Sequence, residues 1–359
     1  MYSRIASLVL AALSLASNLL PVAQVDEAAE VILASPIVEA FSAQCTKPSV
    51  RREWRKLSRK ERADYIRAVN CLDNLPHSPD LRPTVFPDDI PPVNESASLY
   101  DDFVYIHMDL NRKIHYTALL LPWHRCDSGE YSDAPDFQNS DFWKDPDPVS
   151  GLGGWGDPSK DYAVTDGGFA GFRLSYPTPH VLRRNFTLQP HLSLPRPYAP
   201  DPELYANETF TAAEVEKMVT GFKGDMIGFQ RYLGAFTGSH NSLHVIVGGD
   251  LGGQCPTDAP PGCISGPTFS ANDPLFWLHH AMVDKIWYDW QRNDPVNFWT
   301  FQGGSVQVIS NYTEYEMWPS GAPPLMNLND TMPTDGMFPE MTVYDVMNTT
   351  GGYLCYVYE

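Results

Sequence analysis

The histidines of this chain fall into groups, and these groups constrain its fold more than any other feature. The sequence has three tight groups, and they are His115 with His124, His240 with His244, and the adjacent pair His279 and His280. On a helix, His240 and His244 are one turn apart on the same face, where two imidazoles can reach one metal ion about 2 Å from each nitrogen. A third ligand has to come from a distant segment, so the fold must bring these groups together.

The segment FWLHHAMVD supplies that third ligand on a second predicted helix. Adjacent helical residues point about 100° apart, so only one of His279 and His280 should face the same metal. Asp284, four residues after His280, is predicted to accept a hydrogen bond from a ligand histidine and to orient it. Three other histidines stand alone, and we interpret them as ordinary hydrogen-bonded residues: His77, His180 and His191.

The upstream segment YIHMDLNRKIHYTALLLPWHR holds a second possible trio. His107 and His115 would lie about 12 Å apart along one continuous helix. If both bind one metal, the helix must therefore end between them, at about 111–112. Pro122 then begins a new segment with His124 in its first turn. Three imidazoles with neither thiolate nor carboxylate suit copper or zinc, and zinc hydrolysis fits less well because no obvious Glu base accompanies them.

The composition limits the classes of protein to which this chain can belong. At 359 residues with 43% hydrophobic residues, the chain can bury a core as one large domain or two modest ones. Its net charge of -19 repels phosphate backbones and anionic lipids, so neither nucleic-acid nor membrane-surface binding is expected. In the segment 50–67, basic and acidic residues alternate on a predicted helix, which is typical of a solvated face.

The first residues are typical of a secretory signal peptide. Arg4 precedes an apolar run followed by small residues, so we expect residues 1–23 to be removed and residues 24–44 to form an N-terminal extension of a secreted protein. No second apolar span predicts a membrane anchor. Six N-glycosylation sequons agree with secretion, and they lie at Asn94, Asn185, Asn207, Asn311, Asn329 and Asn348.

Helical periodicity is more frequent than strand periodicity in this sequence. Helices are predicted at about 50–70, 97–118, 211–234 and 273–292. Thr211 followed by Glu214 is typical of a helix N-terminus. Strands are expected only at 245–249 and 352–358. Long connections rich in Pro, Gly, Asp and Asn separate these elements, so the sequence favours a helical core wrapped by irregular loops.

Six cysteines in a secreted chain predict a few disulfides. The expected pairs are Cys45 with Cys71 and Cys255 with Cys263. Cys126 and Cys355 have no assigned partner. Because the sequence contains no Cys-x-x-Cys spacing, a cysteine metal site is not supported.

Taken together, HYTALLLPWHR, the His240/His244 pair and DPLFWLHHAMVDKIW resemble the copper A and copper B signatures of the tyrosinase and catechol oxidase family. The resemblance covers 45–359, from VRREWR to the closing Tyr356-Val-Tyr358, and is similar to the short secreted fungal-type members without a following lid domain. It implies a mainly α fold with an antiparallel four-helix bundle core, few short strands, two copper ions, and a small phenol and O2 as substrates. The implied ligands are His107, His115 and His124 for one copper and His240, His244 and His280 for the other, with His279 not coordinating.

The sequence departs from the family pattern directly after His124. The resemblance implies a helix of several turns at this point, but Cys126, Asp127 and Ser128 follow at once. We therefore expect the catalytic domain to lack a helix near residue 126. Lys113 stands where some relatives have a cysteine linked to a histidine as a thioether, so no such crosslink is expected.

Three further residues are candidates for the substrate pocket by resemblance. Asn241 matches a position that orients a water for deprotonation of monophenols, but no Glu partner lies upstream, near Gln230 and Arg231. This combination favours oxidation of diphenols only. Val245 is interpreted either as a pocket-wall residue or as plain core, and Phe276 as a residue that packs under the second copper.

These observations lead us to expect a secreted dicopper enzyme that converts o-diphenols to o-quinones with O2, with at most weak hydroxylation of monophenols. One alternative is a tyrosinase with full monophenol monooxygenase activity. Alternatives of another class are an O2-binding protein and a copper-binding remnant impaired by the missing helix. The sequence predicts neither the oligomeric state nor the physiological phenol.

Overall fold

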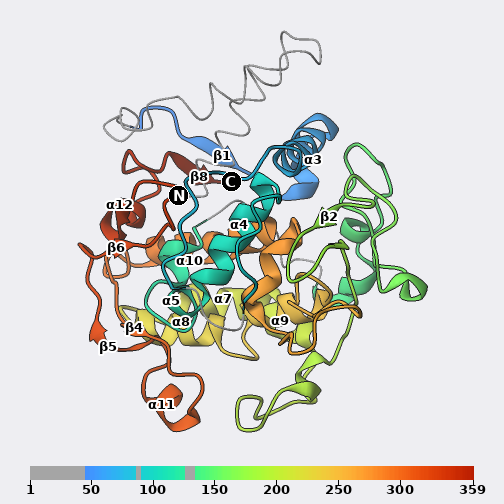
Figure 1. Cartoon of the computed structure of the whole chain (residues 1–359). Helices are drawn as coiled ribbons and strands as arrows, with labels where there is room; N and C mark the ends of the chain where they lie inside the picture. The colour runs from blue at the N-terminus through green and yellow to red at the C-terminus, as the bar shows by residue number, and fades with distance from the viewer. Residues whose placement is uncertain (1–44, 86–89, 126–133) are drawn as a thin grey trace.

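The computed structural model describes residues 45–85, 90–125 and 134–359. The predicted signal peptide, the N-terminal extension, Cys126 and the place of the expected missing helix lie outside the described residues. Helices dominate the described part (Figure 1), and their bounds are α3 Arg59–Asp73, α4 Leu99–Asp109, α5 Asn111–Ile114, α6 Leu120–Trp123, α7 Ala212–Thr220, α8 Met226–Gly234, α9 Ser239–Val247, α10 Leu275–Asn293, α11 Tyr312–Met317 and α12 Val343–Met347.

The remaining elements of the described part are 3-10 helices and short strands. The 3-10 helices are η3 Trp54–Lys56, η4 Ala134–Asn139, η5 Asp141–Trp143, η6 Pro158–Lys160, η7 Pro190–Ser193, η8 Ala206–Phe210 and η9 Pro267–Asn272. The strands are β1 Ser49–Arg51, β2 Arg173–Leu174, β3 His180–Val181, β4 Gly304–Val306, β5 Ala322–Leu325, β6 Thr331–Met332, β7 Met341–Thr342 and β8 Tyr356–Tyr358. β1 pairs with β8 in parallel, and β2–β3, β4–β5 and β6–β7 are antiparallel pairs. The mainly helical class predicted from the sequence is confirmed.

Helix starts follow local sequence signals. Ser58 caps α3 in a capping box with Glu61, and the predicted Thr211 cap accepts a hydrogen bond from the amide of Glu214 at the start of α7. The single helix expected at 211–234 is instead two, α7 and α8. Gly224 between them has φ 69°, a left-handed conformation that a continuous helix does not allow.

Three other boundaries differ from the sequence-based expectation in ways that matter for the histidines. α4 ends at Asp109, so the helix expected at 97–118 is interrupted. α6 begins at Leu120, so His124 follows this helix instead of lying in a first turn opened by Pro122. The strand predicted at 245–249 is wrong, because its first three residues continue α9 with a buried helical face until Gly248, at φ 61°, ends the helix.

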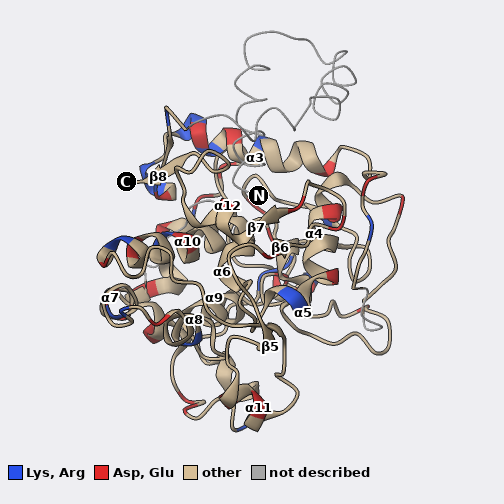
Figure 2. Cartoon of the chain, turned by 90° about the vertical axis from the view of Figure 1, so that its left-hand side faces the viewer, with Lys and Arg blue, Asp and Glu red and all other residues tan. Residues whose placement is uncertain are grey.

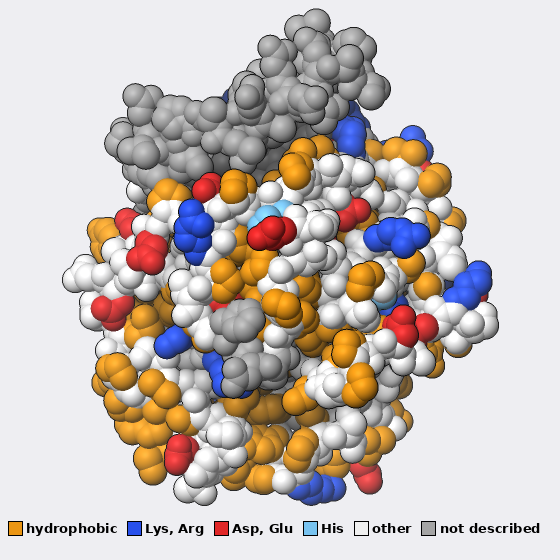
Figure 3. All heavy atoms as spheres, in the orientation of Figure 1, with side chains coloured by type: hydrophobic (Ala, Val, Ile, Leu, Met, Phe, Trp, Pro, Cys, Tyr) orange, Lys and Arg blue, Asp and Glu red, His pale blue; other side chains and the backbone are white. Residues whose placement is uncertain are grey.

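The molecular surface carries both signs of charge. On α3, Lys60 and Arg67 both pair with Asp64, at 2.8 and 2.7 Å, as expected for a solvated helix face. Figure 2 shows both basic and acidic residues on this helix. Basic side chains are scattered singly among acidic and apolar ones on the face shown in Figure 3. None of the helices in the described ranges is long and apolar enough to cross a membrane.

The core is built around α4, α9 and α10. Figure 1 shows α4 and α10 near the middle of the molecule and α3 at its edge. Trp287 and Trp290 on α10 are completely buried, and the ring of Trp290 stacks on Phe229 of α8 at 4.9 Å. α10 contacts α6, α7 and α9, and α4 packs against η9, so residues distant in sequence converge on one interior.

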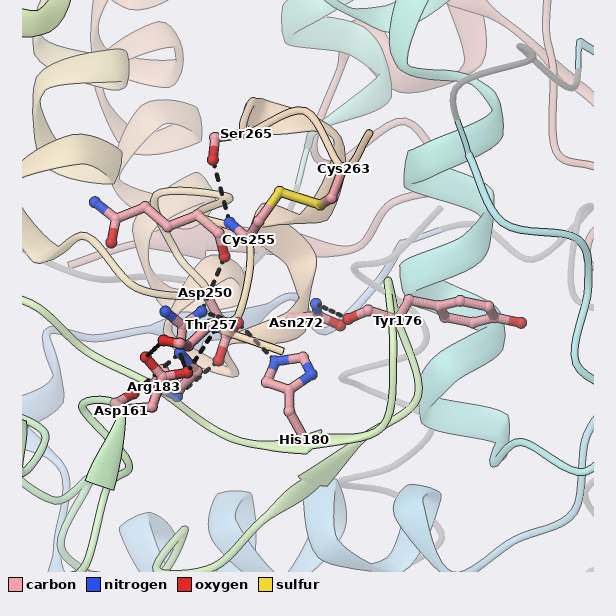
Figure 4. The surroundings of a disulfide bond; sticks show 11 residues. Asp161, Tyr176, His180, Arg183, Asp250, Cys255, Thr257, Cys263, Ser265 and Asn272 are labelled. Atoms are coloured by element: carbon pink, nitrogen blue, oxygen red, sulfur yellow. Dashed lines mark hydrogen bonds and ion pairs between the residues drawn. A yellow bond between two sulfur atoms is a disulfide. The ribbon is translucent and has the colours of Figure 1, made fainter. Parts of the chain in front are cut away.

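The disulfides correct one prediction and confirm another. Cys45 is bonded to Cys355, because the parallel pairing of β1 with β8 brings the two ends of the described chain together, and the amide of Ser49 donates to the carbonyl of Cys355 at 3.0 Å. The predicted Cys45–Cys71 pair is therefore wrong, and Cys71 is a free, exposed thiol on α3. Cys255 pairs with Cys263 as predicted (Figure 4).

Candidate metal centre

Three histidines from the α4–α6 region meet in the core. His107 lies on α4, His115 directly after α5, and His124 directly after α6. Because α4 stops before α5, the chain turns back, and the rings of His107 and His115 lie 5.0 Å apart between centroids. The ring of His124 lies 5.6 Å from that of His107 and 4.8 Å from that of His115. We call these residues the first trio.

A second trio comes from α9 and α10. His240 and His244 lie one turn apart on α9, and His280 lies on α10. The Nε2 atoms of His240 and His244 lie 3.4 and 3.3 Å from Nε2 of His280. Three ring nitrogens therefore point at one small volume, a geometry that a bound cation would stabilise.

The two trios face each other across the core. The rings of His124 and His280 are stacked with centroids 4.4 Å apart and planes inclined by 22°. The rings of His115 and His240 lie 6.2 Å apart. Phe276 packs between the trios, with its centroid 4.1 Å from His280 and 4.8 Å from His107. All six imidazoles therefore form one compact cluster, which we call the histidine nest.

Backbone carbonyls fix the orientation of most of these rings. Each of the first-trio histidines has Nδ1 within hydrogen-bond distance of a carbonyl oxygen, and the acceptors are Thr268 at 3.1 Å, Asn111 at 3.2 Å and Leu120 at 2.7 Å. His244 uses its Nδ1 in the same way on Leu251 at 2.9 Å. Donation from Nδ1 assigns the lone pair to Nε2. The Nε2 atoms of the first trio are buried and have no hydrogen-bond partner among the described residues, as expected of metal ligands.

His279 belongs to the same cluster but uses its ring differently. Its nitrogen lies within 4.8 Å of those of the second trio, and its Nε2 donates to the carbonyl oxygen of His240 at 3.0 Å. The ring of His280, its neighbour on α10, is the one stacked against the first trio. Nε2 of His279 is therefore occupied, whereas Nε2 of His280 is directed to the nest.

Burial keeps the nest uncharged at neutral pH. Desolvation lowers the pKa of His115 to about 3 and that of His244 to about 4. The pKa values of His107, His124 and His280 are lowered by the same cause and by the neighbouring imidazoles. The rings are thus held in the neutral form that binds a metal.

The donor set is chemically selective. Within the described residues, the two buried clusters that could hold an ion contain imidazoles alone, without a carboxylate or a thiolate. Neutral imidazole suits copper, zinc, iron and nickel, and disfavours magnesium and calcium. The residues present therefore fit two transition-metal ions, one per trio.

Comparison with known proteins places this chain in a family. The family model for the common central domain of tyrosinase matches residues 131–293, which include the second trio. A tyrosinase-like protein of Diaporthe leptostromiformis is 30% identical over 88% of this chain and 81% of its own length. The chain belongs to the tyrosinase family. Tyrosinase P of Aspergillus terreus is 26% identical over 88% of this chain and 93% of its own length.

The fold agrees with the family assignment. A polyphenol oxidase structure from Thermothelomyces thermophila superimposes with a TM-score of 0.60, at 22% identity, over 94% of each chain. The family model begins after His124, so the first trio of this tyrosinase-family chain is located by the structure itself.

Asp284 does not orient a histidine, and that prediction is wrong. Its fully buried carboxylate lies 3.1 Å from Nη1 of Arg51 and 2.9 Å from Nε of Arg125. It also accepts hydrogen bonds from the hydroxyls of Tyr356 and Tyr358, at 2.5 and 2.6 Å. Asp284 lies one turn beyond His280 on α10, and its charge organises the end of the chain.

Sequence reasoning missed Arg125, which follows His124 directly. Its guanidinium is fully buried and donates to the carbonyls of Val346 and Met347, at 2.8 and 3.1 Å, and to Gln291 and Tyr356, both at 3.0 Å. It also lies 4.1 Å above the ring of Trp287, a cation–π contact. A charged residue at the end of the apolar run LLLPWHR was the available signal. Arg125 anchors His124 to α10, α12 and β8 where its own helix stops.

The isolated histidines have local partners, as predicted. His77 contacts Asp102 at 2.6 Å, and His191 lies 3.2 Å from the hydroxyl of Ser242. His180 contacts Asp250 at 2.8 Å beside the Cys255–Cys263 loop (Figure 4).

The predicted pocket residues lie around the second trio. Asn241 and Val245 are partly exposed and one turn apart on α9, whereas Phe276 is buried. The amide nitrogen of Asn241 donates to the hydroxyl of Tyr116 at 3.0 Å and lies within 3.0 Å of two carbonyls at the end of α8. This side chain is therefore tied to the protein by its nitrogen.

We predict that Arg125→Met destabilises the protein by about 3–5 kcal/mol, because it leaves the buried carboxylate of Asp284 without its closest guanidinium. Arg52→Met is the matched control, since its pair with Glu61 is more than one-third exposed and should contribute at most about 1 kcal/mol. The free energy of unfolding in guanidinium chloride measures both. Equal losses for the two variants would contradict this account.

A second prediction concerns the neutral imidazoles in metal-free protein. The pKa of His115 is about 3 when folded and 6.5 when unfolded, so the unfolded chain binds more protons as pH falls below 6.5. As the pH falls from 6.5 to 4, this residue should therefore lower the free energy of unfolding by up to about 1.4 kcal/mol for each pH unit. His115→Leu should reduce the slope of the wild-type protein by this contribution, as urea titrations at several pH values would show.

His180→Leu is the opposite-sign control for the pH experiment. Burial disfavours the charged ring of His180, but the bond to Asp250 and its charge outweigh burial and raise the pKa. Its stabilising contribution is present below the unfolded pKa and is lost as pH rises through the folded pKa. Identical pH profiles for wild type and His115→Leu would contradict the assignment of a buried neutral ring.

Proposed function

We propose that this chain is a secreted dicopper oxidase that converts o-diphenols to o-quinones with O2. The observation that carries the proposal is the convergence of six buried imidazoles, in two facing trios, with the first-trio Nε2 atoms left without partners. The proposed ligands of one copper are His107, His115 and His124, and those of the other are His240, His244 and His280. In this proposal residues 45–359 form one catalytic domain with an antiparallel four-helix core.

Copper bound at this site would supply the electron transfer, in which two o-diphenols lose four electrons and four protons and one O2 becomes two waters. The chain's own residues provide geometry and environment. The neutral rings hold the site without adding charge, and burial of all six at no more than 4% exposure excludes bulk water. Phe276 packs beside His280 and His107, so an apolar ring borders both trios.

Oxidation of diphenols, without efficient hydroxylation of monophenols, is favoured by the surroundings of Asn241. Its amide nitrogen is engaged by Tyr116 and by α8. The two residues considered for an acidic partner are also committed, since Gln230 is buried and donates to the carbonyl of Thr117, and Arg231 pairs with Glu316 at 2.6 Å. A monophenol needs a base to remove its proton, and these residues do not supply one.

The proposed location of the protein is extracellular, after secretion. Two disulfides, Cys45–Cys355 and Cys255–Cys263, are typical of an oxidising compartment. Three of the sequon asparagines, Asn94, Asn311 and Asn329, are exposed and accessible to glycosylation. A signal peptide at 1–23 would direct this route.

We expect purified full-length protein to bind two coppers and to oxidise 4-tert-butylcatechol with consumption of O2, but to act on 4-tert-butylphenol at least about a hundredfold more slowly, because proton removal from a monophenol has no assigned base. His280→Ala should lose one copper and all turnover. The matched control His77→Gln changes a histidine outside the nest and should retain two coppers and the turnover of 4-tert-butylcatechol.

The other possible outcomes of these measurements would each support one of the alternative functions. Two coppers with reversible O2 binding and no turnover would indicate an O2-binding protein. Comparable rates on both phenols would indicate a tyrosinase. One copper or none in folded wild-type protein would contradict the proposal and indicate an impaired remnant.

A further inference from the structure

The positions of the six histidines in the backbone are not equivalent. Four of them lie within helices α4, α9 and α10, whose hydrogen-bonded backbone fixes where their side chains begin. His124 follows a helix but is anchored by the neighbouring Arg125. His115 has neither support, because it follows the four-residue α5 with an extended backbone, at φ -120° and ψ 139°.

The residue after His115 adopts an unfavourable conformation. Tyr116 has φ 54°, the left-handed region that a bulky aromatic residue rarely adopts. This conformation turns the chain sharply between α5 and α6. A turn of this kind persists only where surrounding groups hold it, so the contacts of residues 115–117 decide where the ring of His115 lies.

Three side-chain amides from three different elements hold this turn. Gln307, just after β4, donates to the carbonyl oxygen of His115 at 2.9 Å. Asn241 on α9 donates to the hydroxyl of Tyr116 at 3.0 Å. Gln230 on α8 donates to the carbonyl oxygen of Thr117 at 2.8 Å. Three consecutive residues thus each accept a hydrogen bond from one neutral amide.

The packing around Tyr116 reinforces the same position. Its ring stacks on Phe236 with centroids 5.0 Å apart and meets Tyr315 edge-on at 5.9 Å. The amide of Ala118 donates to the carbonyl of Gly304 at 2.9 Å, which joins the turn to β4. The turn is therefore fixed from both of its ends.

One of these bonds links the two trios. Asn241 follows His240 in sequence and Tyr116 follows His115, so the bond between them joins the residues next to a ligand of each trio. The rings of His115 and His240 themselves lie 6.2 Å apart, nearly parallel at 22°. Movement of Tyr116 would therefore change the position of His115 relative to the second trio.

We propose that Gln230, Asn241 and Gln307 are positioning residues that clamp the 115–117 turn, fix His115 toward the first metal, and set the spacing of the two halves of the site. We call these three residues the amide clamp. This inference rests on the proposed function, because it assigns the first trio to a copper ion. It gives Asn241 a structural task that is separate from contact with substrate.

The test uses full-length protein with one trio disabled. In a His280→Ala background the first trio alone is complete, and in a His107→Ala background only the second is complete. Copper affinity is measured by competition with a chelator, and folding by the unfolding temperature of the metal-free protein. Two variants are then added separately to each background: Tyr116→Phe, which removes the hydroxyl that accepts a hydrogen bond from Asn241, and Gln307→Met, which removes the donor to His115.

We expect each variant to weaken copper binding about tenfold in the first-trio background, as loss of groups that orient a ligand does, and less than about twofold in the second-trio background. Tyr315→Phe is the matched control, because it removes a tyrosine hydroxyl from the same aromatic cluster but keeps the ring that packs against Tyr116. It should leave both affinities unchanged, and all variants should keep the unfolding temperature of their parent.

Three results would overturn the inference. If Tyr116→Phe and Gln307→Met bind copper as tightly as their first-trio parent, the amide clamp does not position His115, and the proposed function stands. If neither parental background binds copper, the proposed function fails and the inference fails with it. Equal weakening in both backgrounds would also contradict a clamp specific to the first trio.

Discussion

The buried ion pair between Arg125 and Asp284 is the interaction on which the rest of this structure depends. Arg125 directly follows a histidine of the first trio, and Asp284 lies one turn after a histidine of the second, so their 2.9 Å contact joins the segments that carry the two trios. Both side chains are fully buried, and removing either partner would leave an unpaired charge in the core. The pair therefore holds only when the surrounding hydrogen bonds are complete.

Those surrounding bonds come from both ends of the described chain. Arg51 on β1 and the two tyrosines of β8 all reach the carboxylate of Asp284. The guanidinium of Arg51 also lies 3.2 Å above the ring of Tyr356. The Cys45–Cys355 disulfide closes the same corner. One charged network therefore joins the two ends of the described chain and also contacts the segments that carry the histidine nest. The fold and the site depend on each other for this reason.

The sequence predicted the parts of this protein whose signals are local. Helical periodicity located α3, α4 and α10 and predicted one helix where α7 and α8 lie, and the spacing of the histidine groups indicated which segments had to meet. Prediction from the sequence failed where contacts between distant segments determine the structure. The partner of Cys45 depends on β1 lying beside β8, and no local pattern around Cys45 or Cys71 encodes that pairing.

Asp284 shows the same limit. Its spacing from His280 allows contact with a histidine, but two arginines from distant segments outcompete that contact. The strand predicted at 245–249 failed for a different reason, since a short run of β-branched residues reads alike in a strand and in the buried end of a helix. The hydrogen bonds from three amides to residues 115–117 could not be predicted either, because single Gln and Asn residues carry no periodic signal.

The central claim is that two metals lie between two facing trios of imidazoles. Crystals of the copper-loaded full-length protein, with diffraction recorded on both sides of the copper absorption edge, test it most directly. We expect two anomalous peaks in the nest, each about 2 Å from three Nε2 atoms, as is usual for imidazole ligands. A single peak, or copper ligated mainly by residues outside the two trios, would contradict it.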